Sequence, residues 1–122
     1  MTVSFGGIGE MVITFYNDAT YKASAGDPVN MTDDGEVGKT AASGRFIGVA
    51  ITADDDFAAV QTAGYIVMPY TGDTAPSVGY THLISNGSGG VKVDAGTEGV
   101  YTGAEYLVID VDTTAKKVGF II

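Results

Sequence analysis

The side chains of this sequence best suited to acid–base or metal chemistry are one histidine and fifteen acidic residues. There is no cysteine among its 122 residues. His82 lies between Thr81 and Leu83, in a stretch with the character of a strand and without a recognisable motif. A catalytic histidine needs a nucleophile and an orienting acid that the fold brings to it. Since nothing around His82 marks such partners, we interpret it as a structural or exposed residue.

Three short acidic clusters have the residue type that binds hard cations. A calcium site takes six or more oxygens, commonly from one loop with acids at alternate positions and a distant bidentate glutamate. None of the clusters has this pattern, and each lies where a strand is expected to turn. We therefore expect solvated turn acids and no bound metal, with 54–56 as the first place to look for calcium. The clusters are residues 33–36, 54–56 and 110–112.

Tyrosines and paired carboxylates could also serve a carbohydrate site. Two carboxylates can hydrolyse a glycoside, but a polysaccharide cleft usually needs aromatic platforms, and the chain has no tryptophan. Tyr65 with Tyr70, or Tyr101 with Tyr106, could line a sugar-binding face, although packing in the core or across strands is the better interpretation. The glycine-rich stretches lead into no helix and so offer no phosphate site. We expect no cofactor and predict that the protein is not an enzyme.

The elements that must position these residues are short strands separated by glycine or aspartate turns. Asn86-Gly87 is the strongest hairpin signal, and residues 33–35 (Asp-Asp-Gly) predict a second tight reversal. Gly48 interrupts a strand, where a close backbone approach or a bulge is expected. Strands are predicted at 11–16, 28–31, 36–39, 46–52, 57–62, 65–68, 80–84, 91–93, 106–111 and 118–122.

This spacing predicts an all-β fold, a small single-domain β-barrel or β-sandwich over residues 11–122. Residues 1–10 are glycine-rich and aperiodic, and we expect them to form a flexible N-terminal arm. The chain ends on three apolar residues, which predicts that its terminus lies in a sheet or against a neighbouring subunit.

Charge and hydropathy exclude several classes of function. Six basic against fifteen acidic residues give a net charge of −9, which disfavours both nucleic acid and anionic membranes as partners. No stretch is long enough to span a membrane. The N-terminal stretch lacks the basic start and apolar run of a signal peptide. Synthesis in the cytoplasm is therefore expected.

The order of several turn-and-strand segments carries a family resemblance. They are residues 25–29 (Ala-Gly-Asp-Pro-Val), 46–50 (Phe-Ile-Gly-Val-Ala), 58–64 (Ala-Ala-Val-Gln-Thr-Ala-Gly) and the ending from 89–93 through 118–121. In this order they resemble the small head decoration, or capsid cement, proteins of tailed bacteriophages. The resemblance covers most of residues 11–122, and the insert at 53–56 and the tyrosine-rich middle of the chain depart from it. It implies a compact β-domain, often a trimer without catalytic residues, that binds expanded capsids and clamps neighbouring major capsid subunits.

On this resemblance we expect a virion structural protein, made in the host cytoplasm, that decorates the capsid surface and stabilises it against internal DNA pressure. Its expected partner is the major capsid protein, and its expected state is a homotrimer. The alternative is a receptor- or carbohydrate-binding β-module of a tail fibre or surface structure. A third hypothesis is another virion part, such as a tail tube or head-completion protein.

Sequence position and composition single out two sets of contact residues. The arm and the first predicted strand are candidates for contact with the capsid, because glycines let the arm conform to the edge strand of another chain. The apolar chain end is a candidate subunit interface. The capsid-contact residues are Val3, Phe5, Ile8, Met11 and Ile13, and the interface residues are Phe120, Ile121 and Ile122.

Overall fold

The computed structural model describes residues 5–122, and its strands alternate with turns along the whole of that range. The described residues contain ten strands and no helix, so the prediction of an all-β fold is confirmed. No helix among them could therefore span a membrane. The strands are β1 (Met11–Asn17), β2 (Pro28–Asp33), β3 (Glu36–Lys39), β4 (Gly48–Ala53), β5 (Phe57–Ala63), β6 (Tyr65–Pro69), β7 (Gly79–Ser85), β8 (Val91–Val93), β9 (Glu105–Asp112) and β10 (Lys117–Ile121).

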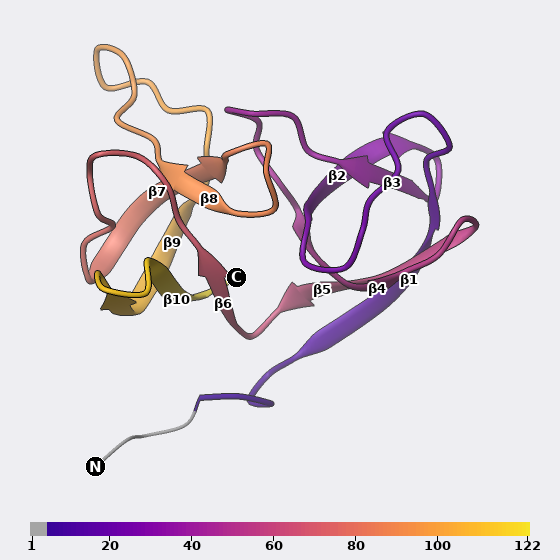
Figure 1. Ribbon diagram of the computed structural model, residues 1–122, viewed down its shortest axis with the longest axis horizontal. Coiled ribbons are helices and arrows are strands. Elements are labelled where there is room, and N and C mark those ends of the chain that lie inside the picture. The colour runs from indigo at the N-terminus through magenta and orange to yellow at the C-terminus, as the bar shows by residue number, and fades with distance from the viewer. Residues whose placement is uncertain (1–4) are drawn as a thin grey trace.

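The first five strands close into a small barrel, in the order β1-β3-β2-β4-β5 (Figure 1). β1 runs antiparallel to β5 along its length, but it meets β3 in parallel only at Tyr16–Glu36 and Asn17–Val37. The barrel interior is filled mainly by small side chains, as a narrow barrel requires. Its buried residues are Ala23, Val29, Val37, Ala50, Ala58 and Val60.

The last five strands form an antiparallel sheet in the order β6-β10-β9-β7-β8. A single bridge between Tyr70 and Val91 brings the two outer strands of this sheet together at one end. The inner face of the sheet holds larger apolar side chains than the barrel does. They are Ile66, Met68, Leu83, Val91, Tyr106, Val108, Val118 and Phe120.

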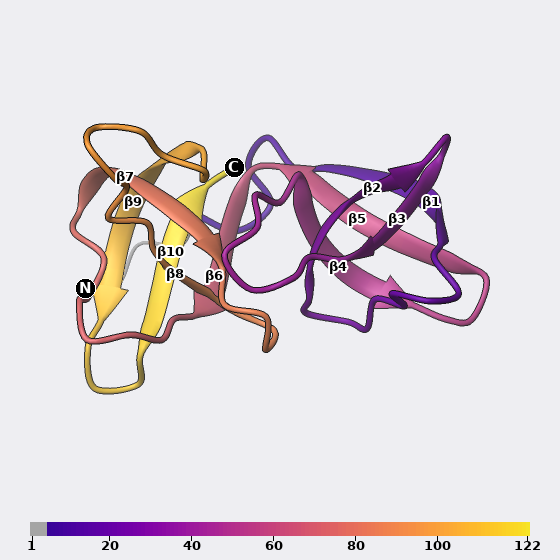
Figure 2. The ribbon, with the colours of Figure 1, turned by 90° about the horizontal axis from the view of Figure 1, so that it is seen from above.

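Barrel and sheet lie side by side (Figures 1 and 2). Both contribute to the apolar core on the inner face of the sheet, which we call the second core. Phe46, on the segment that leads into β4, stacks on Tyr106 at 5.3 Å and meets the ring of Phe120 edge-on at 6.4 Å. The Tyr106 hydroxyl donates a hydrogen bond to the Phe46 carbonyl at 3.3 Å. Val49 of β4 joins the same cluster. A residue contributed from the barrel half thus holds the two halves together.

The turn predictions are confirmed where glycine is needed. Gly35 closes the β2–β3 hairpin with a φ of +67°, and Gly87 lies in the β7–β8 loop with a φ of +77°. At Gly48 a Cβ atom would overlap the carbonyl oxygen of Gln61, so the expected close approach is present. β4 begins at Gly48, two residues later than predicted, because Phe46 leaves the barrel for the second core.

Candidate functional site

The most exposed apolar region of the barrel lies along β1. Met11, Val12 and Ile13 are 55%, 50% and 40% exposed, and Thr14 is also exposed. They stay uncovered because the N-terminal half of β1 extends past the end of β3, while β5 continues alongside it (Figure 1). Among residues 5–122, no strand therefore pairs with one side of β1 over most of its length.

Backbone hydrogen bonds show which groups face that side. The Asn17 amide donates to the Asp56 carbonyl at 2.9 Å, toward β5, and the Tyr16 amide donates to the Gly35 carbonyl at 2.9 Å, toward β3. Because backbone groups alternate along a strand, the N–H and C=O groups of Thr14 and Val12 point the same way as those of Tyr16. No strand among residues 5–122 pairs with them there.

Apolar side chains surround this edge. Tyr16 stacks on Phe57 of β5, with ring centroids 5.5 Å apart and planes 28° apart, and both rings remain exposed. Ile8, on the turn before β1, is 70% exposed. We call residues 11–16 together with Ile8 and Phe57 the β1 margin.

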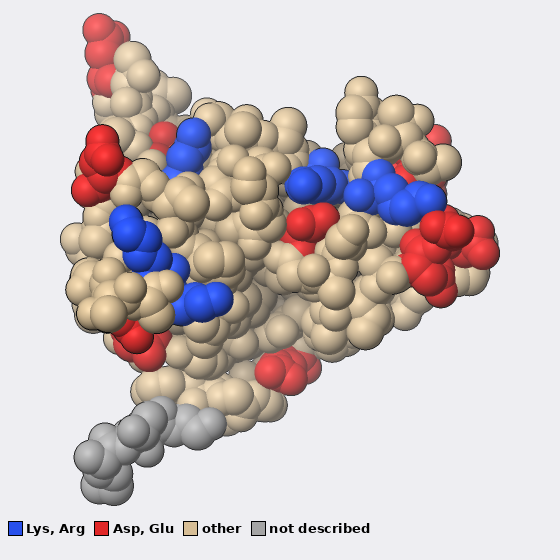
Figure 3. Space-filling view, in the orientation of Figure 1, with Lys and Arg blue, Asp and Glu red and all other residues tan. Residues whose placement is uncertain are grey.

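The β1 margin carries no charged residue, although the chain has a net charge of −9. Glu10 lies at one end, between Ile8 and Met11. The acidic β2–β3 turn, with Asp33, Asp34 and Glu36, adjoins Tyr16 at the other end. In Figure 3 the lower edge of the barrel is free of charged side chains between acidic groups. An uncharged apolar strip thus lies between two acidic ends.

The predicted capsid-contact residues fall into three situations. Ile8, Met11 and Ile13 are exposed on the β1 margin. Phe5 lies against Tyr65 of the second sheet, with ring centroids 5.4 Å apart, so the segment from Met11 back to Phe5 runs from the barrel to the sheet. Val3 lies outside the described residues.

The predicted interface residues at the chain end do not behave as a set. The expected position in a sheet is confirmed, because β10 pairs with both β6 and β9. Phe120, however, is fully buried in the core of its own chain, which corrects its assignment to a subunit interface. Ile121 lies on the outer face of the sheet, and the Ile122 amide donates to the Gly64 carbonyl at 3.0 Å.

His82 is held by a local network on the second sheet. Its ring stacks on Tyr101 at 3.8 Å with planes 2° apart, Nδ1 lies 3.0 Å from the Gly103 carbonyl, and Nε2 lies 3.5 Å from Glu105. Asp94 accepts hydrogen bonds from the amides of Gly96, Thr102 and Gly103. These amides, that of Gly103 above all, lower the pKa of Asp94. The network organises the loop before β9.

Two of the three acidic clusters hold a carboxylate that caps a turn. Asp54 accepts hydrogen bonds from the amides of Asp56 and Phe57, and these bonds lower the pKa of Asp54. Asp112 does the same for Thr114 and Ala115. Within residues 5–122, no group of three or more histidine or acidic side chains is placed to hold a metal ion.

Neither tyrosine pair forms an open aromatic platform. Tyr70 and Tyr106 are buried in the second core, so each pair has a member that no sugar can reach. The Tyr65 hydroxyl donates to Asp110 at 2.7 Å. Burial, and then this hydrogen bond, raise the pKa of Tyr65 to about 12.

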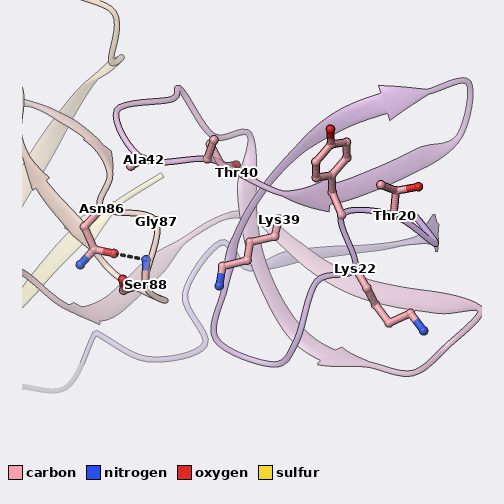
Figure 4. A pocket seen from close by; sticks show the side chains of 10 residues that line it. Thr20, Lys22, Lys39, Thr40, Ala42, Asn86, Gly87 and Ser88 are labelled. Carbon is pink, nitrogen blue, oxygen red and sulfur yellow. Dashed lines mark hydrogen bonds between the residues drawn. The ribbon is translucent and has the colours of Figure 1, made fainter.

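A groove of about 550 Å³ lies between the barrel and the β7–β8 loop (Figure 4). Lys39 extends across it toward residues 86–88, whereas Lys22 points away and pairs with Asp55 at 2.8 Å. Asn86 stabilises its own loop, accepting from the amides of Ser88 and Gly90. This groove was not predicted, because its walls come from segments more than forty positions apart in the chain.

Sequence reasoning placed strand 11–16 in the contact region without singling out Val12, Thr14 or Tyr16, and it missed Phe57. The available signal was the run of residues 11–16, which lacks the apolar–polar alternation of a half-buried strand.

Comparison with models of protein families and with curated proteins found no match to this chain. The β1 margin and the groove are the surfaces of this chain that bear on its function.

Proposed function

We propose that this protein is a non-enzymatic virion component that decorates the outer surface of an expanded phage capsid and stabilises it. The observation that carries the proposal is the β1 margin, an uncharged apolar strip with an open backbone edge on an otherwise acidic domain. Soluble proteins normally cover or blunt such an edge, and an uncovered one marks an interaction site. Its proposed partner is the major capsid protein.

The physics of capsid stabilisation suits a small binding domain. Many copies bound to a symmetric shell gain avidity without any catalytic chemistry. A protein that binds the intact shell more tightly than its separated subunits stabilises the shell by linkage. We propose a homotrimer as the bound form, with Ile121 as a contact candidate on the exposed outer face of the sheet.

Co-sedimentation with heads of the encoding phage tests this function. Purified protein is mixed with expanded heads and, separately, with unexpanded proheads. We expect saturable binding to expanded heads alone, with a copy number set by the shell symmetry. Absence of binding to both particles would refute the proposal.

Deletion of residues 2–9 tests the role of the arm. The deletion leaves every strand of the barrel and sheet in place, so the fold should persist while head binding is lost. Circular dichroism checks the fold, because the Phe5–Tyr65 contact is removed as well. If the deleted form binds heads as strongly as the full chain does, the arm makes no capsid contact, and the contact lies within residues 10–122.

The second candidate is a receptor- or carbohydrate-binding module. The groove between the barrel and the β7–β8 loop favours it, because Tyr21 on its wall is 64% exposed beside polar side chains. An exposed tyrosine presents an apolar ring with a polar hydroxyl, a combination that suits contact with a sugar ring. A glycan array decides: saturable binding that Tyr21→Ala abolishes, without affinity for heads, would favour this candidate.

A further inference from the structure

The open edge of β1 suggests how a partner is held, as well as where. We propose that the β1 margin accepts one additional strand from its partner, an uncharged β-branched segment flanked by lysine or arginine. Strand addition of this kind gains affinity from main-chain hydrogen bonds and specificity from alternate side chains. The inference rests on the proposed function only in assigning the added strand to a capsid protein.

The length of the edge limits the added strand. The unpaired stretch runs from Met11 to Phe15, five residues or about 17 Å of extended chain. Val12 and Thr14 present two N–H and two C=O groups along it. The barrel already uses the next part of this edge, where β3 pairs with Tyr16 and Asn17. An added strand of about five residues would therefore lie in line with β3.

Side chains on both faces of β1 would contact the added strand. Phe15 packs against the barrel core, and Ile13 lies on the same face nearer the open end of the barrel. Val12, Thr14 and Tyr16 lie on the opposite, outer face. Because β1 is apolar on both faces at this end, an added strand with alternating β-branched residues would cover apolar surface on both sides.

Charge at the ends of the β1 margin selects the flanks of the partner. Glu10 lies at one end, and Asp33, Asp34 and Glu36 lie at the other. A basic residue at each end of the added strand would meet a carboxylate, whereas an acidic one would be repelled.

The same charges oppose pairing between two copies of this chain. Antiparallel pairing of two β1 edges would bring Glu10 of one copy toward the acidic β2–β3 turn of the other. Parallel pairing would set the two Glu10 residues beside each other. Like charges across paired strands are destabilising, so the edge favours a different chain over a second copy.

Proline at position 14 tests strand addition. The Thr14 amide points to the open side, so Thr14→Pro removes a donor for the partner and keeps the β1–β5 bonds. Thr14→Val changes the same side chain and keeps the amide. We expect Thr14→Pro to lose at least about tenfold in affinity for expanded heads, and Thr14→Val to stay within about twofold. Equal binding by both variants would overturn strand addition, provided that Thr14→Pro melts as one folded species.

A synthetic peptide tests the partner chemistry independently of heads. The probe is acetyl-Lys-Lys-Thr-Val-Thr-Val-Thr-Lys-Lys-amide, and its control has glutamate in place of every lysine. We expect the lysine peptide alone to slow hydrogen exchange at the Val12 and Thr14 amides. Asp34→Lys should weaken this binding severalfold, whereas Asp73→Lys, on an exposed loop of the other half, should not. Equal binding of both peptides would overturn the charge selection.

The outcomes separate this inference from the proposed function. Peptide binding without head binding would refute capsid decoration and leave strand addition standing. Head binding that survives Thr14→Pro would refute strand addition and leave capsid decoration standing. A concentration-dependent dimer that Thr14→Pro dissociates would make the occupant a second copy and overturn the assignment to a different chain.

Discussion

At the scale of single residues, Gly119 explains how one face of the second sheet is organised. Gly119 of β10 pairs with Val67 on one side and Asp110 on the other. The Tyr65 side chain lies across it, and its hydroxyl donates to Asp110 at 2.7 Å. A Cβ atom at position 119 would overlap both the Tyr65 hydroxyl and the Asp110 carboxylate. An aromatic ring that covers a strand glycine in this way also fixes the strand register.

Gly119→Ala should therefore lower the free energy of unfolding by about 1–3 kcal/mol, because Tyr65 and Asp110 must move apart. Tyr65→Phe keeps the ring and removes only the hydroxyl, and should lower it by about 0.5–1.5 kcal/mol. Urea unfolding measures both changes. A Gly119→Ala variant as stable as the parent would show that the fold does not need the Tyr65 side chain to lie across residue 119.

Two tyrosines make stability depend on alkaline pH. Burial raises the pKa of Tyr106 to about 12, and burial with the bond to Asp110 raises that of Tyr65 to about 12, from an ordinary value of 10.0. Between these values the unfolded chain releases protons that the folded chain keeps, so the free energy of unfolding falls as pH rises. We expect no loss from these groups below pH 10 and a decline from about pH 10 to 12. Urea unfolding across this range, with Tyr65→Phe declining less steeply, checks the assignment.

At the scale of elements, the open edge of β1 should show in hydrogen exchange of the free protein. The Ile13 and Phe15 amides face β5 and should exchange slowly, whereas those of Val12 and Thr14 face solvent and should exchange fast. Residue-resolved NMR exchange measures the alternation. Slow exchange at all four positions in a monomer would mean that another segment covers the edge.

Most strands were predictable because they are short runs with β-branched or aromatic residues bounded by a turn signal, and β3 was predictable from the Asp-Asp-Gly turn before it. Prediction placed the start of β4 at Phe46 because an apolar residue next to a strand resembles part of it. Only the folded chain shows that Phe46 packs in the core of the other half. One edge of β1 is unpaired because only two of its residues pair with β3. That pairing joins segments that are distant in the sequence. Sequence position therefore indicated Ile8, Met11 and Ile13 but gave no reason to choose Val12 or Thr14.

At the scale of the whole molecule, Phe46 couples the barrel to the sheet. Its ring is buried against Tyr106 and Phe120. Phe46→Ala should lower the free energy of unfolding by about 3–5 kcal/mol and broaden the transition as the halves separate. Val78→Ala, at an exposed site, is the control and should change it by no more than about 0.5 kcal/mol. If Phe46→Ala loses little stability and its unfolding transition stays as sharp as that of the parent, other contacts join the two halves.

We propose that this acidic β-domain binds a capsid through the β1 margin. Hydrogen exchange with mass spectrometry, on the protein alone and saturated onto expanded heads, tests function and site together. We expect binding to slow exchange most in the peptide covering residues 10–17, where Val12 and Thr14 gain partners. Unchanged exchange there, with protection only on other surfaces such as β7 and β9, would contradict it.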